Sequence, residues 1–216
     1  MSNLIVVTGG IGSGKSYIAD LLAEKLKATT VDFDKVWHDK LGTDELKNKI
    51  VTKFGSVVLD DIDVERQIDR KRLGQIVFSS PEIMSEYMAL IAPDLKEMEK
   101  DIFEYHIGNS HKYVILEIPV SFNYTPFESE YRKDALFVGV FASMATRIRR
   151  ICMRSGQMIK DAEAERRIRF QPCPSQYMHL CDVAYWNDYM NVRSDDEIDA
   201  KKSLVKTIVG KFIDGV

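Results

Sequence analysis

Near its start the chain reads Leu4-Ile5-Val6-Val7-Thr8-Gly9-Gly10-Ile11-Gly12-Ser13-Gly14-Lys15-Ser16. The apolar run from Leu4 to Val7 stops at two glycines, which is typical of a short buried strand. The residues from Gly9 to Ser16 match the phosphate-binding pattern G-x-x-x-x-G-K-[ST]. Because this match follows a predicted strand and opens an amphipathic helix, it predicts nucleotide binding in an α/β protein.

Each residue type in this loop has a physical role. Glycines let the backbone curl so that its N–H groups point at phosphate oxygens, and the following helix adds its positive end. Lys15 is expected to reach the β- and γ-phosphates, and the Ser16 hydroxyl to hold Mg²⁺. The predicted nucleotide-binding residues are Gly10, Ile11, Gly12, Ser13, Gly14, Lys15 and Ser16. The glycine spacing G-x-G-x-G disfavours a dinucleotide-binding fold, which needs G-x-G-x-x-G.

The composition narrows the class of protein. The chain has 216 residues, 45% of them hydrophobic and 29% charged, with a net charge of −3. Such a chain can bury a core without disulfides, and its composition argues against disorder and against coating nucleic acid. No apolar run approaches the roughly 20 residues that span a bilayer. Three cysteines, an odd number without metal-site spacing, are expected to be reduced thiols in the cytoplasm.

The order of the predicted elements indicates the fold class. Strands are expected at 4–7, 29–33, 113–118, 136–141 and 182–186. Helical segments separate them, which predicts a parallel sheet covered on both faces. The long helical block before the third strand should form a subdomain over the carboxyl edge of the sheet, with Pro93 starting a second helix or kinking the first. Trp186 is expected in the core, and Ser194 to Glu197 form a capping box for a last helix.

Carboxylates stand at the ends of two predicted strands. Asp32 and Asp34 would share one face of the second strand and project beside the phosphate loop. An acceptor hydroxyl needs such a carboxylate to orient it and take its proton, although Asp34 could instead cap the next helix. Glu117 ends the third apolar run and could hold Mg²⁺ through water, or be a plain strand-end residue. His38, one turn after Asp34, could face a substrate or be a surface or core histidine.

Two arginine-rich helices follow the fourth strand. Arg147, Arg150 and Arg154 share a helical face, and three more arginines occupy the next helix. Joined by Ser155-Gly156, the pair could close as a lid over ATP phosphates, since guanidinium groups bind oxygens bidentately. The alternative is a solvated helix with ion pairs. We assign function to Arg147 and Arg154 and place most of the other arginines on the surface.

With these motifs together, the sequence resembles the dephospho-coenzyme A kinase family over nearly its whole length. Thr8 to Ser16 resembles the phosphate loop of that family, and Val31-Asp32-Phe33-Asp34 resembles its D-x-D segment. The segment Ile68-Asp69-Arg70 with Leu73 and Ile76-Val77-Phe78 resembles its substrate helix. Gln171 and the stretch from Cys181 to Asn187 resemble late elements near the adenine of ATP.

The resemblance implies a P-loop NTPase three-layer α/β fold with a five-stranded parallel sheet. It implies a single domain with a core (1–34, 112–142, 180–216), a helical substrate-binding insertion (35–111) and a lid (143–179). The implied reaction is transfer of a phosphoryl group from ATP·Mg²⁺ to the ribose 3′-hydroxyl of dephospho-CoA. Asp34, Lys15, Arg147 and Arg154 would be catalytic, Asn187 would bind the nucleotide, and Ser16 and Glu117 would hold the metal.

Departures from the family pattern fall mostly on the acceptor side. Ala92 stands where the family has histidine, Met144 where it has glutamine, and Pro119 to Asn123 differ from P-L-L-F-E. One alternative is therefore a (deoxy)nucleoside monophosphate kinase with a pocket rebuilt from Gln67, Tyr87, Phe122, Asn123 and Tyr124. Another is a non-catalytic ATP-binding module. A GTPase switch is disfavoured because no N-K-x-D segment is present. We expect a monomer or weak oligomer that takes a small-molecule substrate, and neither nucleic acid nor membrane as a partner.

Overall fold

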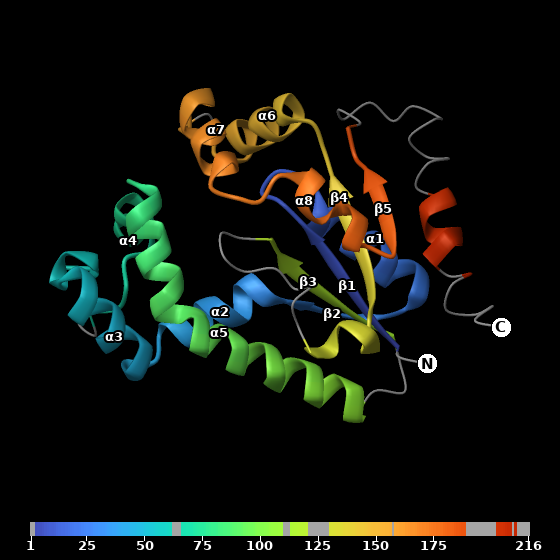
Figure 1. The fold of residues 1–216 in the computed structure, drawn as a ribbon, viewed down its shortest axis with the longest axis horizontal. Helices are drawn as coiled ribbons and strands as arrows, with labels where there is room; N and C mark the ends of the chain where they lie inside the picture. Colours follow the sequence, from blue (N-terminus) through green and yellow to red (C-terminus); the bar gives the residue numbers. More distant parts are fainter. Residues whose placement is uncertain are drawn as a thin grey trace.

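Five parallel strands form the centre of the molecule, in the order β2-β3-β1-β4-β5 (Figure 1). They are β1 (Leu4–Gly9), β2 (Thr29–Asp32), β3 (Val114–Pro119), β4 (Leu136–Phe141) and β5 (Val183–Trp186). Neighbouring strands pair in parallel, with Val7 beside Glu117 and Asp32 beside Glu117 in the register. The predicted five-stranded parallel sheet is confirmed. Its central strands are largely apolar because helices cover both faces.

This computed structural model describes residues 3–61, 66–109, 113–120, 130–156, 158–188, 202–208 and 210. The helices of the first half are α1 (Lys15–Leu26), α2 (Phe33–Leu41), α3 (Asp44–Phe54), α4 (Arg70–Val77) and α5 (Pro81–Asn109). Those of the second half are α6 (Met144–Arg154), α7 (Asp161–Arg169) and α8 (Pro174–Tyr177). Residues 202–208 are also helical, whereas the predicted capping box at Ser194 lies outside the described residues.

The alternation of side chains along β1 builds the three layers. Leu4 and Val6 point into a core shared with helices α2 to α5, and Ile5 and Val7 point into a second core with α1 and residues 204–208. In Figure 1 the first group of helices lies beside β2 and β3, and α6 and α7 lie beyond the carboxyl ends of the strands. The helical block therefore shares its core with one face of the sheet.

Two local expectations are corrected. Pro93 does not start a second helix, which was one of the two outcomes expected there: α5 continues through it, because Ile91 and Leu95 on either side pack into the same core and a break would expose them. Trp186 is 49% exposed, whereas Tyr185 is buried, since successive side chains of β5 point to opposite faces. The Trp186 ring lies 5.7 Å from that of Phe141.

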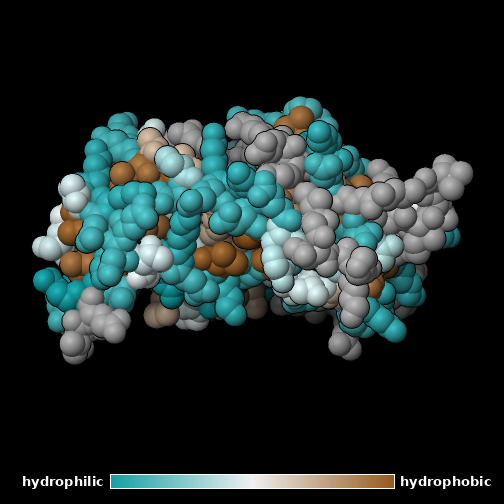
Figure 2. Space-filling model, turned by 90° about the horizontal axis from the view of Figure 1, so that it is seen from below, coloured by the Kyte–Doolittle hydropathy of each residue, from teal (hydrophilic) through white to brown (hydrophobic). Residues whose placement is uncertain are grey.

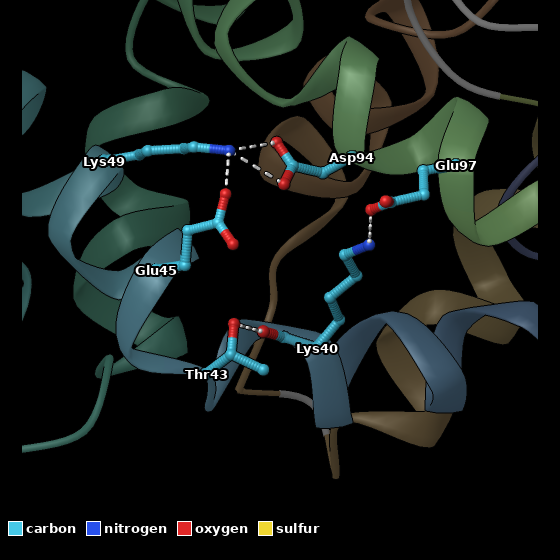
Figure 3. A network of polar contacts seen from close by, with 6 residues as sticks. All are labelled: Lys40, Thr43, Glu45, Lys49, Asp94 and Glu97. Carbon is cyan, nitrogen blue, oxygen red and sulfur yellow. Dashed lines mark hydrogen bonds and ion pairs between the residues drawn. The ribbon is translucent and has the colours of Figure 1, made fainter.

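A polar network ties helices of the helical block together (Figure 3). Lys49 of α3 donates to both carboxylate oxygens of Asp94, at 3.0 and 3.3 Å, and pairs with Glu45 at 2.9 Å. Lys40 of α2 binds Glu97 at 2.6 Å. Asp94 is buried, so this carboxylate needs its lysine partner. Helix α5 is thus held to both α2 and α3.

The outside of the molecule carries few large apolar areas on the face drawn in Figure 2. That face is mostly hydrophilic, with small separate hydrophobic spots. Among the described residues, no helix is long and apolar enough to cross a membrane. The three cysteines are free thiols, and the described residues include no group of three or more metal-ligating side chains of His, Cys, Asp or Glu.

Candidate active site

The phosphate loop leads from the buried strand β1 directly into α1. Gly14, at φ +91°, is the N-cap of α1, so Lys15 and Ser16 occupy its first turn. The Ser16 hydroxyl donates to Glu117 Oε1 at 2.7 Å, and Lys15 Nζ lies 3.3 Å from the same oxygen. The structure therefore brings together the three predicted residues that carry the cation, the hydroxyl and the strand-end carboxylate.

These oxygens suit magnesium. Mg²⁺ prefers oxygen ligands and is usually held by one or two carboxylates together with substrate phosphates. The Ser16 hydroxyl and the half-buried Glu117 carboxylate are such ligands, and they already face one another at the mouth of the loop. The donor set therefore fits Mg²⁺ bound partly by the phosphates of a nucleotide.

The two aspartates are placed differently from the prediction that both share one strand face. β2 ends at Asp32, which is the N-cap of α2 and accepts from the Lys35 N–H at 3.2 Å. Asp34 lies in the first turn of α2, since the capping Asp32 ends the strand one residue before the predicted end at Phe33. The aspartates still influence one another electrostatically. Asp34 is not the N-cap of α2, so its carboxylate is not used for capping and can contact a ligand.

The surroundings of Asp34 raise the pKa of its carboxyl. Burial by the protein around it is the main cause, and the Asp32 charge adds to it. Lys15 and His38 oppose the rise, which places both cations within electrostatic reach of this carboxylate. The residue nevertheless remains open to solvent, so a substrate can approach it. A carboxyl with a raised pKa, within electrostatic reach of the lysine of the loop motif, is an arrangement that suits a proton acceptor.

Helix α6 is bound tightly to the phosphate loop. Arg147, buried at 5% exposure, donates from Nε to the carbonyl oxygen of Ile11 at 2.8 Å. Arg150 donates to the carbonyl oxygens of Gly12 and Ser13, at 3.3 and 3.0 Å. Burial lowers the pKa of Arg147, but a guanidinium keeps its charge in proteins. Two cations therefore bind backbone carbonyl oxygens of the loop and hold its conformation.

Two amides complete this contact. Gln171 accepts at one oxygen from the Ile11 N–H at 2.7 Å and from Arg147 at 2.9 Å, and it donates to the Val120 carbonyl at 2.9 Å. Asn187 is buried and donates to the Ser13 carbonyl at 2.9 Å. The loop is thus fixed by residues from α6, from the turn after α7 and from the end of β5.

Close packing against these side chains explains two glycines. A Cβ at Gly10 would overlap the Arg147 guanidinium, and a Cβ at Gly14 would overlap the Asn187 amide. Gly14 also has the positive φ that L-residues avoid. Glycine is therefore required here both for the loop conformation and for the approach of its supports.

Next to the loop opens a cleft of about 260 Å³ between α2, α4, α5 and α7. Its apolar lining consists of Trp37, Leu41, Leu73, Val77, Phe78, Met84, Tyr87, Met88 and Phe170. Its polar lining consists of His38, Arg70, Arg167 and Gln171. Ile11 also lines it, so the cleft reaches the phosphate loop. Such a largely apolar cleft with a few polar groups is typical of a small-molecule site.

The lining of the cleft includes some of the residues considered for the acceptor side. Tyr87 lines it and makes a hydrogen bond with Trp37, and burial raises the pKa of Tyr87 to about 12. Gln67 and Ala92 do not line it. Phe122, Asn123 and Tyr124 lie outside the described residues. His38 is exposed and lines the cleft, and its contact with a substrate stays a prediction.

Two sequence assignments on α6 differ in outcome. Arg150 is not the surface residue that we expected, because it binds the loop and also the Asn187 carbonyl at 2.8 Å. The signal was available, since Arg150 shares a helical face with Arg147. Arg154, at the exposed end of α6, makes no hydrogen bond or ion pair within the described ranges. Its role in binding phosphates stays a prediction.

Comparisons with known proteins agree with this geometry. The model of the family described as dephospho-CoA kinase matches residues 3–191. A dephospho-CoA kinase domain-containing protein of Danio rerio is 35% identical over 174 residues, covering 78% of this chain and 70% of that protein. A dephospho-CoA kinase of Lactobacillus acidophilus is 31% identical over 191 residues, covering 87% of this chain and 89% of the relative.

Solved structures show the same fold. Dephospho-CoA kinase from Campylobacter jejuni superposes with a TM-score of 0.65 at 22% identity, and the match covers all of both chains. A shikimate kinase from Bacteroides thetaiotaomicron reaches 0.57 at 14% identity and covers 98% of each chain. At such identities the likeness concerns the fold alone, which is that of P-loop kinases.

Proposed function

The chain belongs to the dephospho-CoA kinase family, whose activity is the ATP-dependent phosphorylation of dephospho-CoA, and we propose how its residues divide this work. One observation supports the assignment most directly. The cleft beside α2 opens onto the phosphate loop at Ile11, and Asp34 lies within electrostatic reach of Lys15. An acceptor in the cleft can therefore present a hydroxyl between the γ-phosphate and a carboxylate.

Asp34 is the proton acceptor in this proposal. Its carboxylate hydrogen-bonds the ribose 3′-hydroxyl of dephospho-CoA and takes its proton as the oxygen attacks the γ-phosphorus. The bond from the γ-phosphorus to the β–γ bridging oxygen breaks, and ADP leaves. Asp34 thus acts by orienting the nucleophile, because phosphoryl transfer depends mainly on positioning and charge.

Lys15 and the loop N–H groups hold the phosphates of ATP, with Gly10 to Ser16 as the cradle. Lys15 is released from Glu117 when phosphate oxygens replace that carboxylate. Ser16 and Glu117 would then hold Mg²⁺, Glu117 through water, and the ion would neutralise charge on the phosphate oxygens. Arg147, Arg150 and Asn187 keep the loop in its binding shape, and Arg154 is the lid residue left free to reach the transferred group.

The wider organisation is part of the same proposal. Residues 35–111 form the substrate-binding insertion, 143–179 the lid, and the remainder the nucleotide-binding core. The expected surroundings are the cytoplasm, where thiols stay reduced, and the expected form is a monomer or weak oligomer. Size-exclusion chromatography with light scattering tests the second point.

A coupled ADP-release assay tests the function. Dephospho-CoA is compared with a panel of nucleoside and deoxynucleoside monophosphates, at fixed ATP and Mg²⁺. The unaltered protein is expected to turn over dephospho-CoA. Asp34→Asn should lose this turnover but still bind ATP. Lys15→Ala should bind ATP more weakly and react more slowly. Turnover confined to monophosphates would mean a changed acceptor. ATP binding without turnover of any acceptor would mean a non-catalytic module.

A further inference from the structure

The cleft holds basic side chains that the proposed mechanism does not use. Arg167 is already paired with Glu163 at 2.9 Å and lies over the Phe78 ring. His38 and Arg70, in contrast, make no hydrogen bond or ion pair with any part of the chain that the structure describes. Basic groups that pair with no described residue, in an otherwise apolar cleft, are available to an anionic ligand.

His38 has a special position among them. It follows Asp34 by four residues on α2, so the two side chains lie on one helix face with Cβ atoms about 5 to 6 Å apart. The electrostatic influence of His38 on the Asp34 carboxyl agrees with this spacing. Helix α2 is held in place by the Asp32 cap at one end and by the Lys40–Glu97 pair at the other (Figure 3).

The spacing matches a chemical feature of the acceptor. A ribose carries its 3′-hydroxyl and its 5′-phosphate on one small ring, so two groups one helical turn apart can contact both. We propose that His38 binds the 5′-phosphate of the acceptor nucleotide while Asp34 contacts its 3′-hydroxyl. This assignment rests on the proposed function of Asp34. The pair makes a phosphate at the 5′ position a requirement for tight binding, and thereby sets the acceptor class as 5′-phosphorylated nucleosides with a free 3′-hydroxyl.

A packing role for His38 is a poor alternative. The side chain is exposed, and the apolar lining of the cleft is supplied by its neighbour Trp37 and by α4 and α5. Trp37 is fixed by its hydrogen bond with Tyr87. The imidazole can therefore be replaced without removing a support of the cleft.

The test compares ligands with and without the 5′-phosphate. KM and kcat are measured for ATP and dephospho-CoA, and inhibition constants for 5′-AMP and adenosine as competitors of dephospho-CoA. His38→Gln is expected to raise the KM of dephospho-CoA and the inhibition constant of 5′-AMP about tenfold, the scale of one hydrogen bond to a charged group. The inhibition constant of adenosine, the KM of ATP and kcat should change less than about twofold. His38→Arg should restore most of the affinity.

Lys35→Gln, on the exposed side of the same helix, is the matched control and should behave as the unaltered protein. Equal losses for 5′-AMP and adenosine in His38→Gln would overturn the proposal, as would an Arg variant no better than the Gln variant. Calorimetric binding of dephospho-CoA separates this result from the proposed function. If the unaltered protein binds dephospho-CoA but does not phosphorylate it, the proposed function is wrong. The ratio of the dissociation constants of dephospho-CoA for His38→Gln and for the unaltered protein still tests the role of His38.

Discussion

Arg147 Nε donates to the carbonyl oxygen of Ile11 at 2.8 Å, across 136 positions of sequence. This bond joins α6, the first helix of the proposed lid, to the phosphate loop, and Gln171 joins both through a shared oxygen. Helix α6 therefore supports the conformation of the loop in this structure. Changes in α6 should alter ATP binding through the shape of the loop.

Arg150→Met should weaken ATP binding. The variant loses the donors to the Gly12 and Ser13 carbonyls, so the Gly12 carbonyl loses this partner and the Ser13 carbonyl keeps its bond from Asn187. We expect the KM of ATP to rise about tenfold, with a smaller change in the KM of the acceptor. Arg149→Met, on the exposed face of the same helix, is the control. Equal effects in the two variants would contradict the support role of Arg150.

Gly14→Ala should abolish nucleotide binding. Its Cβ would overlap the Asn187 amide, and its φ of +91° adds strain of about 1 to 2 kcal/mol. Gly156 also has a positive φ, +59°, and nothing within 4 Å of a Cβ, so Gly156→Ala tests backbone strain without a steric overlap. Thermal unfolding and ATP titration of both variants are the measurements. A Gly14→Ala protein that still binds ATP normally would show that the loop and Asn187 can separate.

Activity should fall at acid pH with a midpoint above the usual range of an aspartate. The cause is that burial raises the pKa of Asp34, whose ionised form must accept the proton. A profile of kcat/KM for dephospho-CoA against pH measures this limb. Asp39→Asn, an exposed change on the same helix, should leave the limb unmoved. A midpoint at the ordinary carboxyl value would count against Asp34 as the proton acceptor.

Asp34→Asn should raise the melting temperature at pH 7. The folded pKa of Asp34 lies above its unfolded value, so the charged carboxylate costs stability at pH values above the folded pKa. Below the unfolded pKa the group is neutral in both states and the cost is gone. The gain from the substitution should therefore shrink as pH falls toward 3.8, which scanning calorimetry at several pH values can follow. A lower melting temperature at pH 7 would refute this.

Glu117→Gln should raise the Mg²⁺ concentration needed for half-maximal activity by about 10-fold or more, the range found for groups that act on a metal through water. The variant keeps the shape of Glu117 but loses the charge that faces Ser16 and Lys15. Rates at fixed ATP are measured as Mg²⁺ is varied, with Glu24→Gln on the exposed side of α1 as control. An unchanged Mg²⁺ midpoint would remove Glu117 from the metal site.

Lys49→Met should destabilise the helical block more than Lys40→Met does. Asp94 is buried and loses its partner in the first variant, whereas Glu97 is 67% exposed and water replaces Lys40 in the second. The melting temperature should fall by about 4 to 8 °C in Lys49→Met and by at most about 3 °C in Lys40→Met. The pair shares one network (Figure 3), so each variant controls for the other. Equal falls would mean that Asp94 finds another partner.

Local sequence patterns predicted the secondary structure well where the burial of apolar side chains decides it. Leu4 to Val7 form a buried strand because successive side chains of a strand point to opposite faces, and helices cover both faces of this sheet. The strand Leu136–Phe141 has the expected bounds, and the first arginine-rich helix follows it as predicted. The prediction failed at Asp34 because the Asp32 cap, two residues earlier, turned the chain into a helix.

The phosphate-loop motif and the family resemblance could be recognised from sequence alone, because the motif is a contiguous pattern of glycines followed by Lys15 and Ser16. The roles of Lys15, Ser16 and Asp34 stay predictions. Only the tertiary structure showed that Arg150, Gln171 and Asn187 support this loop, and that His38 lines the cleft beside α2. These contacts join segments more than a hundred positions apart. Their partners are backbone carbonyls and N–H groups, which every residue possesses, so no local pattern of side chains marks them in advance.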